Sequence, residues 1–552
     1  MAAKLKIIPL GGLNEIGKNL TVYEYGDDIL VVDCGLGFPD EEMYGVDIVI
    51  PDITYLVQNK EKIRAFVFTH GHEDHIGAIP YVLRQIDAPI YATRLTAGLI
   101  EIKLQEHGLL ETTKIVTLEA GESFRAGVFG VELIHVNHSI PDSVALAIKT
   151  PIGMIVHTGD FKIDVTPIDI DLIDLTRFGE LGKQGVLMLL SDSTNVEKPG
   201  HSDSERKVGA RFDQLFKDCD KRIIITTFAS NVHRVQSIIN SAAKYGRRVA
   251  ITGRSMENIM RVSTELGYMK VPKDTLIDIN QISQVPRDKL VIITTGSQGE
   301  SMSALYRMAF SGHRQVEITS SDRVIISASA IPGNENTISR VINELFLKSA
   351  EVIYDRLDEL HVSGHACMEE LKMMLALVRP KFFMPVHGEQ RHLHRHAELA
   401  RFMGVEPSHI VIGDLGKIVE VTRKSAKLAG SVTAGRVLVD GTGVGDVGSV
   451  VLRDRRHLAQ DGMLVVVMTL SAEDSTLISG PDIITRGFVY VKESDALMEE
   501  LKRVVLESLD GCERCNITDW ATIKAKVKAN LSGYLYKQTK RSPMILPVIM
   551  EV

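Results

Sequence analysis

Four candidate metal ligands lie within the stretch THGHEDHIGA at 69–78. His70, His72, Asp74 and His75 follow an apolar run, IRAFVF, so we expect them in a tight loop at the end of a buried strand. Imidazole and carboxylate groups are ligands that zinc takes in proteins. The first histidine pair and the Asp74–His75 pair project differently, which favours two adjacent ions. A solvated loop that is merely rich in histidine is disfavoured, because burying four ionisable groups without partners is costly.

Three more candidate ligands end strand-like segments later in the chain. They are His138 after VELIHVN, Asp160 after GMIVHTG and His387 in FFMPVHG. Each alone would be read as a structural or surface residue. Together with the histidine-rich loop they complete one set of ligands for two ions.

Two zinc ions in such a set would define the chemistry of the site. They bring four positive charges, of which two aspartates and a bridging hydroxide would cancel three. Two ions about 3.5–4 Å apart lower the pKa of the water that they share. The site would therefore provide a nucleophile and a clamp for an anionic oxygen, which suits a phosphodiester but also a lactam or a thioester.

The elements that must position these residues change along the chain. Up to about Gly200 the sequence consists of short Val- and Ile-rich runs, with one clear helix expected over 95–110. From about Asp203 helices alternate with strands, which indicates a mainly parallel sheet covered on both faces. The short-strand pattern returns at about Glu351.

This pattern predicts an α/β protein in several parts. A first domain occupies 1–204 and 351–430 and is interrupted by an inserted α/β domain at 205–350. The glycine-rich stretch DGTGVGDVGS within 431–449 predicts a linker. Residues 450–552 predict a small α+β domain, with strands in GMLVVVMTL and RGFVYVK and two helices between 496 and 539.

The composition is that of an ordinary globular protein. The chain has 552 residues with 63 Lys and Arg against 71 Asp and Glu, a formal net charge of −8. This excludes a polycationic nucleic-acid coat protein and a disordered chain. Five mostly isolated cysteines and the lack of a long apolar run favour a soluble, cytoplasmic protein without disulfides, signal peptide or membrane contact.

The motif HxHxDH, followed by a His, an Asp and a distant His, resembles the metallo-β-lactamase superfamily, whose fold is an αββα sandwich. The resemblance implies that His70, His72 and His138 hold one zinc, that Asp74, His75 and His387 hold the other, and that Asp160 bridges them. It also implies that Asp33, in VVDCG, supports the ligand loop.

The long interval between Asp160 and His387 resembles the β-CASP branch, whose members cut RNA or DNA. That branch implies an acidic residue and a histidine before the last ligand, which Asp192 in LLSDSTN and His365 in HVSGHA match. GGLNEIGKN (11–19), HVSGHA (361–366) and DIITRGFVYV (482–491) resemble the bacterial ribonuclease J family over essentially the whole chain.

This family resemblance implies a 5′→3′ exoribonuclease with additional endonuclease activity, acting in mRNA decay and rRNA maturation. It implies single-stranded RNA as substrate, two Zn²⁺ per subunit with Mn²⁺ as an alternative, and a homodimer or homotetramer assembled through the last domain. RNA-decay or ribosome-associated proteins are further expected partners. The implied catalytic residues are Asp74, His365 and Asp192.

Two segments are implied to bind the RNA. In HVSGHA, Ser363 and His365 can donate to phosphate oxygens, and Gly364 lets backbone amides approach closely. The family implies contacts from His361, Val362, Ser363, Gly364 and His365. His365, oriented by Asp192, is also a candidate acid for the departing 3′ oxygen.

The second segment, FASNVHR at 228–234, follows a strand and opens a helix. The family implies that Ser230, Asn231 and Val232 bind the 5′-phosphate. The alternative is simple helix capping by Ser230 or Asn231, and the two are compatible because a helix N-terminus favours anions.

Weaker signals remain open. Asp47 and Asp440 match positions that bind Ca²⁺ in some relatives. His392 and His396 share one helical face, which we interpret as solvated and basic, with RNA contact as the alternative. Cys512 and Cys515 form a single CxxC and are read as ordinary cysteines.

Two other functions compete with the ribonuclease. One is a β-CASP DNA nuclease, because no residue visibly reads the 2′-hydroxyl group that distinguishes RNA. The other is a catalytically idle RNA-binding scaffold, which is disfavoured because such a protein would be expected to lose ligands.

Overall fold

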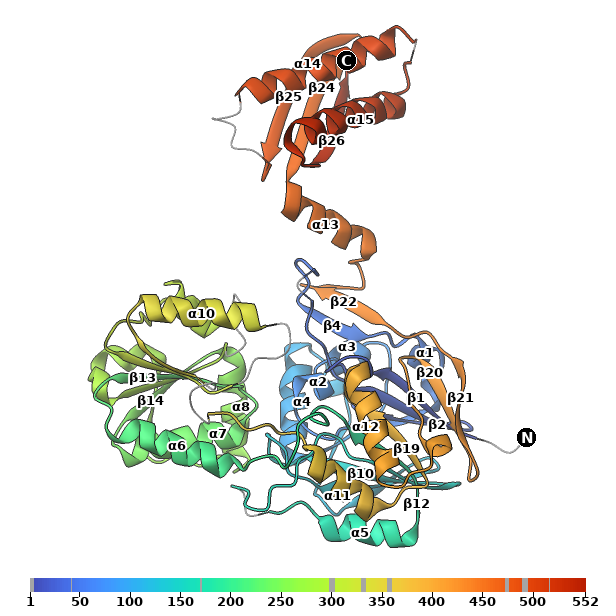
Figure 1. Ribbon diagram of the computed structural model, residues 1–552, viewed down its shortest axis with the longest axis vertical. Coiled ribbons are helices and arrows are strands. Elements are labelled where there is room, and N and C mark those ends of the chain that lie inside the picture. The colour runs from blue at the N-terminus through green and yellow to red at the C-terminus, as the bar shows by residue number, and fades with distance from the viewer. Residues whose placement is uncertain are drawn as a thin grey trace. The chain divides into compact units, whose positions relative to one another are not determined.

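The computed structural model describes residues 4–40, 42–168, 171–296, 303–328, 334–354, 360–471, 476–488, 495–515 and 517–552. The chain divides into two compact units (Figure 1). The first comprises residues 1–37 and 49–437, and the second comprises 38–48 and 438–552. No helix in these described ranges is long and apolar enough to cross a membrane.

Two sheets form the centre of the first unit. The eight-stranded sheet has the order β21 (Ala426–Ser431), β20 (Lys417–Val421), β1 (Leu5–Gly11), β2 (Leu20–Tyr25), β3 (Asp28–Val32), β5 (Ile63–Val67), β6 (Ile90–Thr93) and β7 (Ile115–Leu118). The six-stranded sheet has the order β19 (Phe382–Val386), β12 (Val186–Asp192), β11 (Gly153–His157), β10 (Val144–Thr150), β9 (Phe129–His135) and β8 (Ser123–Ala126).

The two sheets pack face to face because alternate side chains of their strands are apolar. Leu30 and Val67 of the first sheet share one buried cluster with Leu146 and Leu190 of the second. The outer face of the six-stranded sheet is covered by helices through a further apolar cluster. The helices of this part are α1 (Thr54–Gln58), α2 (Glu73–Ile76), α3 (Ile79–Val82), α4 (Arg94–Glu106), α5 (Leu175–Gln184), α11 (Met368–Val378) and α12 (Gln390–Phe402), and the strand β4 (Ile48–Pro51) precedes α1. The predicted αββα sandwich is confirmed.

The inserted domain carries the predicted parallel sheet. Its strands have the order β15 (Leu276–Ile277), β14 (Arg248–Thr252), β16 (Leu290–Thr294), β13 (Arg222–Thr226), β17 (Asp322–Ile326) and β18 (Glu351–Tyr354), and neighbouring strands run parallel. Figure 1 shows α10 on one side of this sheet and α6 on the other. The helices are α6 (Glu205–Lys217), α7 (Val232–Lys244), α8 (Arg254–Glu265), α9 (Ala304–Ala309) and α10 (Glu335–Leu347).

One strand of the inserted sheet lies beyond the expected domain limit. We expected the core to resume at 351, but β18 pairs with β17 and extends the inserted sheet through Tyr354. A short strand looks the same in sequence whichever sheet it joins, so the pattern could not place this limit.

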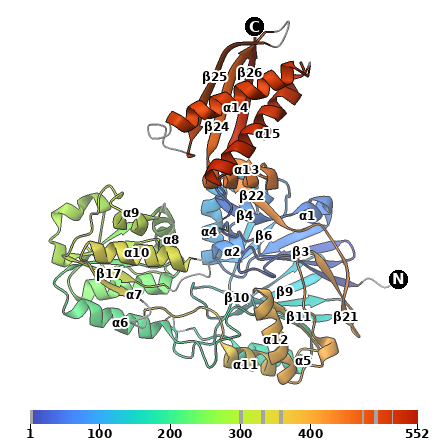
Figure 2. The ribbon, with the colours of Figure 1, turned by 45° about the horizontal axis from the view of Figure 1, so that its top comes forward.

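The second unit contains the C-terminal α+β domain. Its sheet has the order β25 (Leu477–Arg486), β24 (Met463–Leu470) and β26 (Met544–Glu551), and α14 (Asp495–Glu513) and α15 (Trp520–Thr539) pack on it through a shared apolar cluster (Figure 2). The expected strand RGFVYVK starts at Arg486, where β25 ends, and its residues 489–492 lie outside the described ranges.

The predicted linker at 431–449 is not devoid of structure. It contains β22 (Arg436–Asp440) and β23 (Gly443–Val444), and the helix α13 (Ser449–Asp461) begins at its end. No side chain of α13 is buried. Its apolar side chains Val450, Val451 and Leu458 are exposed, and the sequence did not predict this helix.

Candidate metal centre

The seven candidate ligands lie at the ends of strands from both sheets of the sandwich. His70 and His72 follow β5, and Asp74 and His75 lie in the short helix α2. His138 follows β9, Asp160 follows β11 and His387 follows β19. Because the two sheets pack face to face, these strand ends meet at one edge of the sandwich.

Three overlapping groups of potential ligands result. In each group the ligand atoms lie within 4.8 Å of one another. The groups are His70, His72, His138 and Asp160; then Asp74, His75, Asp160 and His387; and finally Asp160, Asp192, His365 and His387. The first two are the sets expected for two ions, and Asp160 belongs to both.

The first group brings three imidazole nitrogens close together. Nδ1 of His72 lies 3.1 Å from Nε2 of His70 and 3.1 Å from Nε2 of His138. Burial lowers the pKa of His72 to about 4, and burial with neighbouring histidines lowers the pKa of His70 and His138 well below the usual value. These rings are therefore neutral near pH 7, and lone pairs that converge on one point fit a cation.

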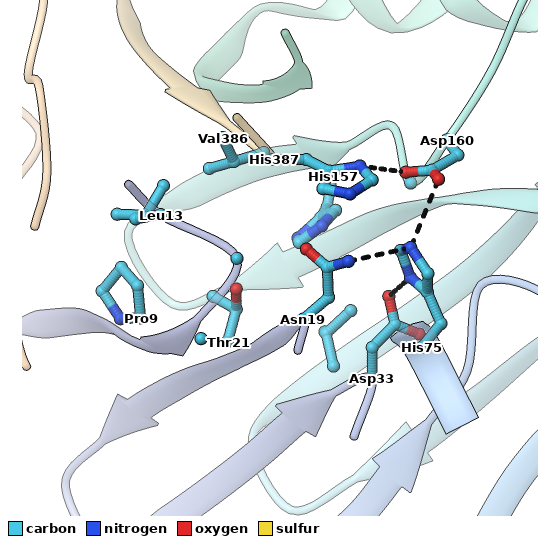
Figure 3. A pocket seen from close by; sticks show the side chains of 14 residues that line it. Pro9, Leu13, Asn19, Thr21, Asp33, His75, His157, Asp160, Val386 and His387 are labelled. Atoms are coloured by element: carbon cyan, nitrogen blue, oxygen red, sulfur yellow. Dashed lines mark hydrogen bonds and ion pairs between the residues drawn. The ribbon is translucent and has the colours of Figure 1, made fainter. Parts of the chain in front are cut away.

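The second group combines two carboxylates with two imidazoles. Nδ1 of His387 lies 2.8 Å from Asp160 Oδ1, and Nε2 of His75 lies 3.3 Å from Asp160 Oδ2 (Figure 3). Burial lowers the pKa of His387, but Asp160, Asp74 and Asp192 raise it to about 10. The buried Nε2 of His387 makes no hydrogen bond. An orphaned nitrogen beside carboxylates fits a divalent cation.

Asp33 supports the ligand loop as expected. Its carboxylate lies 2.8 Å from Nδ1 of His75 and accepts a hydrogen bond from the backbone N–H of Thr69 at 2.8 Å. Asp33 has a φ of 61°, in the left-handed region that non-glycine residues rarely adopt. The contact holds the His75 ring with its other nitrogen turned toward the ligand group.

His365 and Asp192 form a pair beside the ligands. Nδ1 of His365 lies 2.8 Å from Asp192 Oδ2, and the side chain of His365 is 20% exposed. Burial lowers the pKa of His365, but the adjacent carboxylate of Asp192 raises it above the usual value. His365 is therefore a partly exposed, readily protonated imidazole held at the edge of the metal centre.

Backbone geometry holds the HVSGHA loop against the first ligand group. The carbonyl oxygen of Gly364 accepts from Nδ1 of His138 at 2.7 Å, and a Cβ at Gly364 would lie 2.6 Å from that imidazole ring. Only glycine allows this approach. Asn195 donates to Ser363 Oγ at 2.7 Å and to the His365 carbonyl at 3.1 Å. Asn195 was missed, although it lies in the LLSDSTN motif.

In the second predicted RNA-binding segment, the Asn231 side chain is used within the protein. It accepts from the backbone N–H of Arg234 and donates to Glu205 at 2.9 Å, so it caps α7. Ser230 is partly exposed and Val232 is buried. The capping interpretation is thus supported, and phosphate binding here stays a prediction.

Arg234, which the sequence did not single out, connects the two predicted RNA-binding segments. Its fully buried guanidinium pairs with Glu205, donates to the Ser327 carbonyl at 2.9 Å and lies 3.1 Å from Nδ1 of His361. An arginine at the start of an ordinary helix gives no sequence signal of burial.

The interpretation of His392 and His396 as a solvated face was wrong. They are 4% and 0% exposed, because this face of α12 packs toward the six-stranded sheet. Nδ1 of His396 lies 3.0 Å from Ser193 Oγ. Arg391 and Arg395 stand next to these histidines in the sequence, so the segment was read as a polar, exposed face.

The burial of His396 predicts a pH-dependent stability. Burial lowers its pKa to about 3, well below the value of about 6.5 in an unfolded chain. The contribution of neutral His396 to the free energy of unfolding is thus fully present above pH 6.5. It is lost as pH falls toward 3, at up to about 1.4 kcal/mol per pH unit. In urea denaturation at pH 7, 6 and 5, we expect His396→Phe to weaken this pH dependence. A matching change in His394→Gln, an exposed histidine on the same helix, would contradict this assignment.

The calcium hypothesis stays a prediction. The Asp440 carboxylate lies 2.5 Å from a guanidinium nitrogen of Arg455, and Asp47 Oδ2 accepts from the backbone N–H of Gly441 at 2.7 Å. Both carboxylates therefore already have partners within the second unit. Cys512 is buried and Cys515 exposed, and both are free thiols.

A cavity of about 1080 Å³ lies between the two-sheet sandwich and the inserted domain. Its lining includes His135 and Asp164 from the core and His233 and Tyr268 from the inserted domain. A smaller pocket that His135 and His233 also line reaches His138. An open space thus adjoins the metal centre.

Family models match successive parts of the chain. They are the metallo-beta-lactamase superfamily over 13–226, the ribonuclease J beta-CASP domain over 220–345, the Zn-dependent metallo-hydrolase RNA specificity domain over 351–411 and the ribonuclease J C-terminal domain over 450–552. A crystal structure of a protein of unknown function from Enterococcus faecalis covers 76% of this chain with a TM-score of 0.54 and 17% identity, which shows the fold alone.

Curated relatives match over nearly the full length. The chain is 41% identical to ribonuclease J2 of Bacillus subtilis, over 99% of both chains. It is 44% identical to ribonuclease J of Thermus thermophilus, over 99% of this chain and 95% of the relative. With this likeness over every domain and a site that brings the expected ligands together, the chain belongs to the ribonuclease J family.

Proposed function

We propose that this protein is a zinc-dependent ribonuclease that degrades RNA from the 5′ end, prefers 5′-monophosphate ends and also cleaves internally. The observation that carries the proposal is the set of adjoining ligand groups that share Asp160, with the His365–Asp192 pair beside them. The ribonuclease J relatives support RNA as the substrate. Roles in mRNA decay and rRNA maturation, a cytoplasmic location and assembly into dimers or tetramers through residues 450–552 belong to the same proposal.

Two divalent ions would be held by the two ligand groups. His70, His72 and His138 would hold one, Asp74, His75 and His387 the other, and Asp160 both. When bound, such ions lower the pKa of a shared water and stabilise negative charge on phosphate oxygens. Zinc suits the imidazole-rich set, and Mn²⁺ is the alternative.

His365 would donate a proton to the departing 3′ oxygen as its bond to phosphorus breaks. The raised pKa of His365 keeps a proton available near neutral pH, and Asp192 fixes the ring by its contact to Nδ1. Nε2 is then the nitrogen that faces the substrate.

The chain also offers a path for RNA. Hydroxyl and amide groups of the HVSGHA loop would bind phosphates next to the ligands, and the N-terminus of α7 at Ser230 would favour the 5′-phosphate. In this proposal the core (1–204 and 360–430) and the inserted domain (205–354) form opposite walls of the cleft. Each cut leaves a new 5′-phosphate on the shortened RNA, so the product is the next substrate.

The test uses one RNA sequence with 5′-monophosphate, 5′-triphosphate or 5′-hydroxyl ends, and the matching DNA. We expect mononucleotides from the monophosphate RNA first, and no cleavage after complete chelation. Cleavage that persists without metal would overturn the mechanism. Equal cleavage of DNA would favour a DNA nuclease, and RNA binding without cleavage would favour a scaffold.

We expect His365→Gln and Asp192→Asn to lower RNA turnover by about 10²-fold or more, because proton transfer to the leaving oxygen is lost. Metal content should remain that of the wild type. Bis(4-nitrophenyl) phosphate provides the control, since its leaving group departs without protonation and its hydrolysis should change little. An equal loss on both substrates would show that the pair does not act as the acid.

A further inference from the structure

The proposed function leaves the motif GGLNEIGKN at 11–19 without a role. This segment joins β1 to β2, and its residues Gly12, Leu13 and Asn19 line a pocket together with His75 and His387 of the second ligand group. It contacts both segments that supply that group. The bridges Leu13–Gly388 and Glu15–Gly388 tie it to the residue after His387, and the backbone N–H of Asn19 donates to the Asp74 carbonyl at 2.9 Å.

Asn19 ends this segment and points its carboxamide at the ligands (Figure 3). Nδ2 of Asn19 lies 3.0 Å from Nε2 of His75, 3.2 Å from the Asp74 carbonyl oxygen and 3.5 Å from Asp74 Oδ2. Asn19 is 9% exposed. Since the Asp33 carboxylate faces Nδ1 of His75, Asp33 and Asn19 hold the ring from its two nitrogens.

We propose that Asn19 is a positioning residue for the second metal position, and that it holds Asp74 and His75 in their ligand orientation. Nδ2 of Asn19 lies beside the nitrogen of His75 that would face the ion. If Nε2 of His75 binds a cation, the Asn19 amide can still donate to the carbonyl and the carboxylate of Asp74. The segment 11–19 thus fixes both ligand loops of one position. Among the described residues, Asn19 forms no hydrogen bond with His70, His72 or His138.

A substitution at Gly12 offers an independent way to displace the Asn19 carboxamide. A Cβ at Gly12 would lie 2.2 Å from Oδ1 of Asn19, and Gly12 has a φ of 78°. Gly12→Ala would therefore displace the carboxamide without changing any ligand or Asn19 itself.

The inference rests on the proposed metal centre, and it concerns metal retention rather than RNA cleavage. We expect Asn19→Ala to weaken the second position by about 10- to 100-fold, as loss of a residue that orients ligands commonly does. Wild type and variant are loaded with Zn²⁺ or Co²⁺ and dialysed against graded chelator. Metal per chain is then measured by mass spectrometry, and the Co²⁺ absorption spectrum is recorded. The variant should lose one of two ions at a chelator concentration that leaves the wild type loaded, and Gly12→Ala should behave alike.

Asn195→Ala is the matched control, because it also removes a buried carboxamide with two hydrogen bonds but contacts the HVSGHA loop. It should keep the second ion, which is the one that Asn19→Ala is expected to lose. Thermal unfolding of the metal-free proteins separates misfolding from a positioning role: Asn19→Ala should unfold near the wild-type temperature without metal and gain less stability on metal addition. A metal-retention curve for Asn19→Ala that coincides with wild type would overturn the inference. Failure of the wild type to bind metal would instead overturn the proposed function.

Discussion

Asp160→Asn should abolish RNA hydrolysis, with a fall in kcat/KM of at least about 10³-fold, or about 4 kcal/mol. Asp160 belongs to all three ligand groups. Its Oδ2 lies 3.3 Å from Nε2 of His75 and 3.7 Å from Nε2 of His70, so one carboxylate faces both metal positions. The asparagine side chain removes the negative charge of Asp160. Its N–H groups would also donate to the imidazole nitrogens of His70 and His75, which must be free to bind a metal ion. Metal content should therefore fall at both positions, unlike in Asn19→Ala.

Asp164→Asn is the control that separates loss of metal binding in Asp160→Asn from misfolding of the loop that carries both residues. Asp164 is also a buried carboxylate, 5% exposed, and accepts from the backbone N–H of Thr166 at 2.9 Å. It lies in none of the ligand groups found among the described residues. We expect this variant to keep its metal. Full metal content in Asp160→Asn, measured alongside single-turnover cleavage of 5′-monophosphate RNA, would mean that Asp160 does not bridge the two positions.

The ligand set could be predicted because its members follow strands directly or lie, like Asp74 and His75, in the short helix just after β5. Val- and Ile-rich runs identify buried strands, and His138, Asp160 and His387 stand directly after such runs. The metallo-β-lactamase resemblance implied the two-layer sandwich and the two ligand sets, and in such a fold the ends of these strands meet at one edge. The alternation of helices with strands predicted the parallel sheet of the inserted domain.

Residues whose role depends on tertiary burial could not be predicted. Arg234 and His396 are both 0% exposed, yet each stands among polar residues on an otherwise ordinary helix. Their environment is created by partners distant in sequence, Glu205 and His361 for Arg234 and Ser193 for His396. Hydrophobic periodicity carries no information on such pairs. The helix α13 was missed for the opposite reason, since it buries no side chain.

Arg234→Met should destabilise the protein by about 3–5 kcal/mol, the usual cost of leaving one partner of a buried ion pair without the other. The side chains of Arg234 and Glu205 are 0% and 6% exposed, so little water reaches the carboxylate that would remain. Arg234 also donates to the Val362 carbonyl and lies beside His361. The variant should therefore also weaken RNA binding. Urea denaturation measures the first effect, and binding of a phosphorothioate RNA measures the second.

The double variant Glu205→Leu/Arg234→Met separates stability from function. Replacing both partners by apolar groups of similar size removes the buried charge, so much of the lost stability should return. His361 and Val362 still lack their anchor, so RNA affinity should stay low. If affinity recovered together with stability, Arg234 would serve the fold alone.

The acid limb of the stability curve gives a second test of the pair. Burial would raise the pKa of Glu205, but the Arg234 guanidinium lowers it below the usual 4.5. A carboxyl group whose pKa is lower in the folded state than in the unfolded state stabilises the fold at any pH above its unfolded-state pKa. This stabilisation is lost as pH falls through its folded-state pKa. The wild type should thus lose stability below about pH 4.5 more steeply than the double variant, which has no carboxyl group to titrate there. Parallel curves for the two proteins would mean that the pair contributes nothing at neutral pH. The link between the inserted domain and the HVSGHA loop would then depend on the uncharged contacts alone.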